Sequence, residues 1–274
     1  MSENKNSSEY WSNLASEFFN EFGEESLQET VPVSQIKPMS SENRMILNII
    51  FVIDVSGSMR GTRIAQVNYA LENIFKELKN RDDLNSVVKV AIMEFCDVGI
   101  WKTPQPLLLE DFIFTPIDVK YAYTNYGNAF VELEKKLHKT EFFNPNLGEY
   151  FAPLILFISD GEPVDVNFYP SALEVLKNNP WFKRASKYAI AVGEEAKNMK
   201  VGSIMEQFTG IRENVRYADE GAALCDLIEF ITIKASEVQT SMVSNTYNGA
   251  GGKQNNSVFD NVDNSLFSSL FSGN

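Results

Sequence analysis

Hydroxyl and carboxylate side chains gather in a short segment that could bind a hard metal ion. The segment Asp54-Val-Ser56-Gly-Ser58 places one carboxylate and two hydroxyls at alternate positions. Magnesium takes oxygen ligands in an octahedron and usually keeps several waters, so these side chains suit it. Gly57 lets the loop between the two serines fold tightly. By itself this spacing is only moderately specific.

Two more segments offer the same chemistry further along the chain. Thr124 lies at the start of a helical pattern, and Asp160-Gly161 ends an apolar run. Asp54 also ends an apolar run, and in open α/β sheets ligands bind at the carboxyl ends of the strands. The sequence therefore predicts one site for a magnesium-class ion, built from Asp54, Ser56, Ser58, Thr124 and Asp160.

The elements that must position these residues alternate along the chain. Apolar runs typical of buried strands cover residues 46–53, 87–95, 154–159, 188–192 and 215–217. Helical patterns cover residues 62–79, 125–137, 170–177, 196–207 and 220–237. This alternation indicates βαβ units, and so an α/β fold with a doubly wound, mostly parallel sheet and helices on both faces.

The chain is expected to form one domain with two tails. Residues 1–44 are polar, with one amphipathic stretch at residues 10–22 that could form a short helix. The domain spans residues 45–238. Residues 239–274 are rich in Ser, Asn and Gly, and their apolar residues 266–271 could dock on a partner or have no role.

Composition narrows the class of partner and the compartment. There are 24 Lys and Arg against 37 Asp and Glu, a net charge of −13, and no basic cluster for nucleic acid or an anionic membrane. No signal peptide and no run of about 18 apolar residues is present. The two cysteines, Cys96 and Cys225, are too few for a disulfide framework. A soluble, cytoplasmic protein is expected.

At these residues the sequence resembles von Willebrand factor A domains and their metal ion-dependent adhesion site. That site has the pattern D-x-S-x-S, a distal Thr, and a distal Asp followed by Gly, and every position is filled here. The resemblance covers about residues 46–238. Within the superfamily the chain looks similar to TerY-like bacterial proteins of tellurium-resistance and stress-response clusters, through residues 54–61 and 159–165.

The resemblance implies a role for each residue and a class of partner. Ser56 and Ser58 would bind Mg²⁺, or Mn²⁺ or Ca²⁺, directly, Thr124 would join in the ligand-competent state, and Asp54 and Asp160 would act through waters. An Asp or Glu of a partner protein would complete the octahedron. TerY-like proteins are often encoded beside a kinase and a phosphatase, which are possible partners. One departure is Tyr121-Ala-Tyr123, where such proteins often have Gly-Gly.

Other interpretations of these residues stay open at this point. Asp54, Ser56 and Ser58 could simply form a turn and cap the helix that follows. A metal-assisted hydrolase or phosphotransferase is the enzymatic alternative, but position 56 is Ser where a haloacid dehalogenase needs a second Asp, and no Walker lysine is present. We therefore expect a binding protein and no enzyme.

Other residues near the predicted site are less informative. The single histidine, His138, ends a helical pattern and is expected to face solvent. Tyr123, Tyr126 and Phe168 could surround a docking surface, although packing would explain them equally well.

Overall fold

The computed structural model describes residues 44–81, 86–193, 199–218, 228 and 232–233. Three predicted features lie outside the described residues: the helix at residues 10–22, the C-terminal tail, and nearly all of the helix at residues 220–237.

A seven-stranded sheet forms the centre of the domain, in the order β3-β2-β1-β5-β6-β7, with β4 also pairing with β2. All pairs among the five longer strands are parallel. Among the strands that the structure describes, only β3 and β4 run antiparallel, both against β2. The strands are β1 (Ile46–Asp54), β2 (Val87–Phe95), β3 (Gly99–Trp101), β4 (Leu107–Leu108), β5 (Leu154–Ser159), β6 (Ser186–Val192) and β7 (Val215–Ala218).

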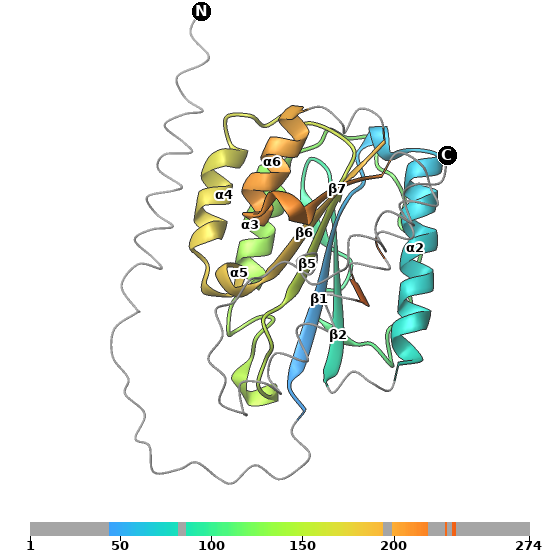
Figure 1. Ribbon diagram of the computed structural model, residues 1–274, viewed down its shortest axis with the longest axis vertical. Helices are drawn as coiled ribbons and strands as arrows, with labels where there is room; N and C mark the ends of the chain where they lie inside the picture. The colour runs from blue at the N-terminus through green and yellow to red at the C-terminus, as the bar shows by residue number, and fades with distance from the viewer. Residues whose placement is uncertain (1–43, 82–85, 194–198, 219–227, 229–231, 234–274) are drawn as a thin grey trace, which may run out of the picture. The chain divides into compact units, whose positions relative to one another are not determined.

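Helices cover both faces of this sheet (Figure 1). The helix α2 (Thr62–Lys79) lies on one face. The opposite face carries α3 (Tyr126–Lys136), α4 (Tyr169–Asn178), α5 (Pro180–Arg184) and α6 (Met199–Thr209). The predicted α/β fold is confirmed. Among the helices that the structure describes, none is both long and apolar enough to cross a membrane.

Strand β1 explains why the sheet is covered on both faces. All nine of its residues are buried, and successive side chains point to opposite faces. Ile49 and Phe51 belong to the hydrophobic cluster that includes α2, whereas Ile50 and Val52 belong to the cluster of α3, α4 and α6. A strand that packs on both sides needs the nearly continuous apolar run seen in the sequence.

Strand β1 lies at the point where the connections turn to opposite sides of the sheet, and a site can form at this point. From β1 the chain passes through α2 to β2 on one side, while β5 lies on the other side and leads into α4. Because α2 and α4 cover opposite faces, the loops after β1 and β5 diverge at the carboxyl edge of the sheet. Such a switch point is where open α/β sheets bind ligands.

Candidate functional site

Asp54 is the last residue of β1 and is fully buried. Its Oδ1 accepts the Ser56 backbone N–H at 2.8 Å, and its Oδ2 accepts the Ser159 hydroxyl at 2.5 Å. The parallel register, with Ile53 opposite Ile158, brings Ser159 beside it. Burial raises the pKa of Asp54 to about 6, although the hydrogen bonds from Ser159 and Ser56 oppose this rise. This carboxylate is therefore one that a nearby cation would stabilise.

The two serines of the same loop connect to the carboxylate that follows β5. Ser56 Oγ and Ser58 Oγ lie 3.1 Å apart, and the Ser58 hydroxyl donates to Asp160 Oδ1 at 2.8 Å. Asp160 is buried like Asp54, although it lies 102 residues from Ser58 in sequence. Four of the five predicted ligands, Asp54, Ser56, Ser58 and Asp160, thus form one continuous cluster.

The alternative in which the serines cap a helix is wrong. Ser56 precedes the short 3-10 helix Gly57–Met59, but its side chain makes no capping hydrogen bond. Gly61 stands at the N-cap of α2, with φ of 83°, and offers no side chain. Only the turn at Asp54 has the expected form, since its side chain accepts the Ser56 N–H. The serine hydroxyls are directed to each other and to Asp160 instead.

Thr124 lies between the other two loops. The Gly57 N–H donates to the Ala122 carbonyl at 3.2 Å, and the Val164 N–H donates to the Thr124 carbonyl at 2.9 Å. Thr124 is 7% exposed, and its hydroxyl makes no hydrogen bond to any residue that the structure describes. The structure therefore places Thr124 next to the cluster without bonding it to the cluster.

Arg63 is a member of the site that the sequence analysis missed. Its Nη1 donates to Asp160 Oδ2 at 2.5 Å and to the Ser58 carbonyl at 3.1 Å. It stands in the first turn of α2, where the helix dipole disfavours a positive charge. This position was the signal from which the contact could have been predicted, because an acidic partner offsets the unfavourable interaction of Arg63 with the helix dipole.

A second aspartate near the site has a structural role. Asp165 accepts the N–H groups of Tyr126 at 3.1 Å and Gly127 at 2.7 Å, and so caps α3, whose own N-cap residue Asn125 makes no such bond. Tyr126 is 1% exposed, and its hydroxyl donates to the Gly161 carbonyl at 2.9 Å. Tyr126 thus holds the loop after Asp160 through this hydrogen bond, and because it is buried it does not belong to a docking surface.

The donor chemistry of the cluster fits a hard cation. Two buried carboxylates and two hydroxyls meet, with the Thr124 hydroxyl on the adjoining segment. Within the described ranges, no three His, Cys, Asp or Glu side chains converge on a point, so a cation here must draw on hydroxyl oxygens. Oxygen-only sites select magnesium, manganese or calcium over metals that prefer sulfur.

The histidine does not take part in this cluster. His138 follows the end of α3, and its Nε2 lies 3.0 Å from Glu134 Oε1. The 11 residues of α3 separate it from the site by about 16 Å, at about 1.5 Å per residue. A catalytic triad with Ser56 or Ser58 is therefore excluded.

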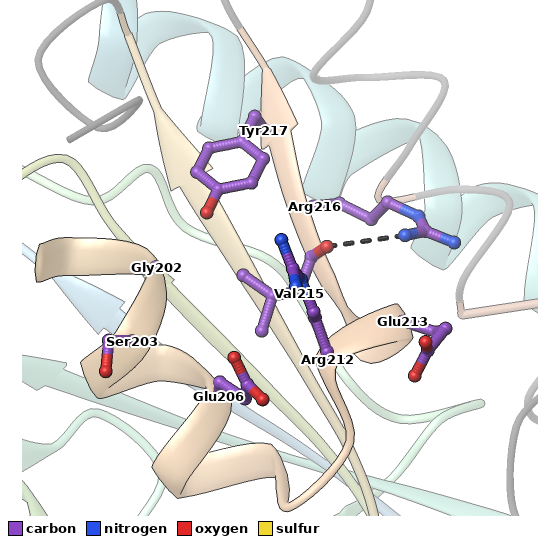
Figure 2. A pocket seen from close by; sticks show the side chains of 8 residues that line it. All are labelled: Gly202, Ser203, Glu206, Arg212, Glu213, Val215, Arg216 and Tyr217. Carbon is purple, nitrogen blue, oxygen red and sulfur yellow. Dashed lines mark hydrogen bonds between the residues drawn. The ribbon is translucent and has the colours of Figure 1, made fainter. Parts of the chain in front are cut away.

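A hollow elsewhere in the domain contains none of the predicted ligands. It has a volume of about 670 Å³ and lies between α6 and β7 (Figure 2). Arg212 and Arg216 share it with Glu206 and Glu213, so its lining favours neither anions nor cations. The Tyr217 hydroxyl occupies the space where a side chain at position 202 would begin, which explains Gly202. The size of this hollow does not indicate a ligand, and the cluster at the end of β1 is the better candidate for the functional site.

Sequence relatives cover part of the chain. No family model matches it. Human inter-alpha-trypsin inhibitor heavy chain H6 is 27% identical over 187 residues, which are 65% of this chain and 14% of that protein. Mouse heavy chain H3 is 32% identical over 138 residues, covering 48% of this chain and 14% of that one. The matched region is thus a small part of much longer proteins.

Solved structures with the same fold cover more of the chain. Proximal thread matrix protein 1 from the mussel byssus has a TM-score of 0.52 at 15% identity, over 70% of this chain and 46% of that one. The pilus adhesin SpaC of Lactobacillus rhamnosus GG has a TM-score of 0.55 at 11% identity, and the match covers 72% of this chain and 31% of that one. A von Willebrand factor type A protein from Catenulispora acidiphila has a TM-score of 0.50 at 13% identity, and the match covers 69% of this chain and 42% of that one. The described part of this chain therefore has the von Willebrand factor A fold.

Proposed function

We propose that this domain binds a divalent cation of the magnesium class and uses it to capture a carboxylate on a partner protein. The protein ligands are Asp54, Ser56, Ser58, Thr124 and Asp160. The observation that carries the proposal is the direction of the two serine hydroxyls. Ser56 Oγ contacts Ser58 Oγ, the Ser58 hydroxyl donates to the buried Asp160, and neither hydroxyl caps α2.

The mixture of neutral and charged ligands suits binding better than catalysis. Hydroxyls donate little charge to a cation, so a cation held through Ser56 and Ser58 keeps its attraction for an outside carboxylate. When bound, the cation supplies the coordination position that an Asp or Glu of the partner occupies.

Exposed apolar side chains beside the site suit a protein partner. Tyr121 and Tyr123, just before Thr124, are 82% and 72% exposed, and Val164 and Val166 on the loop after β5 are also exposed. The Arg60 guanidinium stacks over the Tyr121 ring at 4.1 Å. Aromatic residues and arginine supply much of the binding energy at protein interfaces. We include these side chains in the partner's binding surface.

The comparisons support the cation and the binding role at a general level. The mussel thread protein has been solved with zinc in its adhesion-site motif, with a TM-score of 0.51 at 16% identity to this chain. Another of the similar structures is a pilus adhesin. The cytoplasmic location, the bacterial stress-response setting and a kinase or phosphatase partner stay predictions from the sequence.

Calorimetric titration of Mg²⁺ and Mn²⁺ into the full chain tests the cation. We expect saturable binding by the wild type and a loss of at least about 100-fold in affinity for Asp160→Asn, which removes a charge from the cluster. Asp118→Asn is the matched control, because it removes the same charge from an exposed position. Failure of the wild type to bind either ion, or equal binding by Asp160→Asn, would refute the proposal.

Selection from a displayed peptide library tests the carboxylate. Peptides retained with Mg²⁺ and released by a chelator should share an Asp or Glu, and Tyr123→Ala should weaken their capture by about tenfold. A chelator-insensitive selection would argue against capture through the cation. Turnover of p-nitrophenyl phosphate by the wild type but not by Asp160→Asn would favour the hydrolase instead.

A further inference from the structure

We propose that Arg63 is a fixed counter-charge that weakens the site's hold on its cation and strengthens its hold on the partner's carboxylate. This inference rests on the proposed function and adds to it the residue that sets the charge of the site. Arg63 itself binds neither the cation nor the partner in this proposal.

The guanidinium of Arg63 is held in place from several directions. Its Nη1 bonds to Asp160 Oδ2 and to the Ser58 carbonyl, as described above. Its other side lies against Gly193, where an added Cβ would stand 2.8 Å from Nε and 3.0 Å from Cζ. Gly193 has φ of 87°, so both its conformation and this contact require glycine. The side chain of Arg63 is 24% exposed and that of Asp160 is fully buried.

The placement of Arg63 sets the charge that an incoming carboxylate meets. Asp54, Asp160 and Arg63 together carry a net charge of minus one, and a divalent cation raises this to plus one. A single partner carboxylate then leaves the site neutral. Without Arg63 the cation-loaded site would already be neutral, and the carboxylate would bring an uncompensated negative charge into it. Burying such a charge is unfavourable.

The neighbouring Arg60 does not share the contacts of Arg63. Arg60 lies three residues earlier and stacks on Tyr121, where it is exposed. Arg63 pairs with a cation ligand in the interior of the site. No other Lys or Arg of the described residues forms a salt bridge with Asp54 or Asp160. Arg63 is therefore the residue whose removal should change the two affinities in opposite directions.

Mn²⁺ titration of four full-length variants tests the first half of the inference. Arg63→Gln and Arg63→Met should bind Mn²⁺ about tenfold more tightly than the wild type, because a repelling charge next to the cation is gone. Arg63→Lys and Lys76→Gln should stay within about threefold of the wild type, since one keeps the charge and the other removes an exposed charge that pairs with Glu72 on α2. Circular dichroism identifies the folded variants, and either neutral variant is sufficient for the test.

Acetate is the probe for the second half of the inference, that Arg63 strengthens the binding of a carboxylate. Broadening of the ¹³C-acetate carboxyl signal by bound Mn²⁺, measured at equal Mn²⁺ occupancy, should be stronger in the wild type than in Arg63→Gln. A neutral variant that binds Mn²⁺ no more tightly than the wild type, or that binds acetate equally well, would overturn the role of Arg63 alone. If the wild type binds no Mn²⁺, the proposed function itself fails.

Discussion

Two polar clusters in this domain use their hydrogen bonds in different ways. At the end of α3, Asn179 Oδ1 accepts the N–H groups of Trp181 and Phe182, and its Nδ2 donates to the Leu137 carbonyl at 3.1 Å. At the carboxyl edge of the sheet, Ser58 and Asp160 bond to each other and to Arg63.

We interpret this difference as one between side chains that hold the fold together and side chains that serve the proposed cation site. Side chains that satisfy backbone groups at helix ends replace the hydrogen bonds that those groups need, and so they stabilise the fold. Side chains that bond mainly to one another at the sheet edge leave their oxygens available to a cation. The first cluster should therefore respond to mutation through stability, and the second through binding.

The largest effect on stability is expected from Asn179→Ala. It removes the cap of α5 and leaves the Leu137 carbonyl without its donor, at a cost of about 3 kcal/mol. Urea unfolding measures this loss, and Mn²⁺ affinity should stay unchanged. A loss below about 1 kcal/mol would erase the distinction between the two clusters.

Gly127→Ala should cost about 2 kcal/mol, the effect of overpacking a filled space. A Cβ at this position would overlap the Phe168 ring and stand 2.6 Å from Asp165 Oδ2. Thermal unfolding measures the loss. Gly161→Ala is the comparison, since an added Cβ there meets nothing within 4 Å, and equal destabilisation by both would contradict the packing argument.

The pH dependence of stability should reveal Lys187, which belongs to the architectural group. Its Nζ donates to the Phe182 and Ala185 carbonyls, and burial lowers its pKa to about 8. Between this pKa and the ordinary lysine value of 10.5 the unfolded chain binds more protons than the folded one, so stability due to Lys187 rises with pH in that window. Relative to Lys187→Met, the wild type should gain about 1 kcal/mol between about pH 7.5 and 9.5, after allowance for partial solvent exposure. Parallel urea curves for the two proteins would disprove this.

The smallest change in stability is expected for Ser58→Ala, below about 1 kcal/mol, because Ser58 is exposed and caps no helix. Its Mn²⁺ affinity should nevertheless fall by at least about tenfold. Ser171→Ala is the control, as that exposed hydroxyl donates to the Phe168 carbonyl, away from the site. Strong destabilisation of Ser58→Ala without loss of ion binding would place Ser58 in the architectural group.

Long, strongly patterned elements were predictable from the sequence. The expected ranges 62–79, 87–95 and 154–159 agree with α2, β2 and β5 as the structure has them. The short elements β3, β4 and α5 were missed, because two to five residues carry too little periodicity to stand out. The exposed Leu107 and Leu108 of β4 also lack the buried run by which the other strands were found.

Within the candidate site, the sequence predicted the oxygen-bearing side chains, because their type and order indicate cation binding. The order of carboxylates and hydroxyls indicated which loops meet, and the parallel sheet brings Ser58 and Asp160 together. Sequence patterns did not show that Tyr126 is buried under the site or that Arg63 bonds to Asp160, since both depend on how α2 and α3 pack. Whether a cation occupies the site stays a prediction.

The long sequence distance across the site has a consequence for folding. Ser58 and Asp160 are 102 residues apart, and Asp54 and Ser159 are 105 apart. Contacts of such separation carry a loop-closure entropy cost, which slows their formation during folding. A partially synthesised or misfolded chain in which β5 has not docked on β1 lacks half of the site. If the proposed partner capture needs the whole site, it would be restricted to molecules in which β5 has docked on β1.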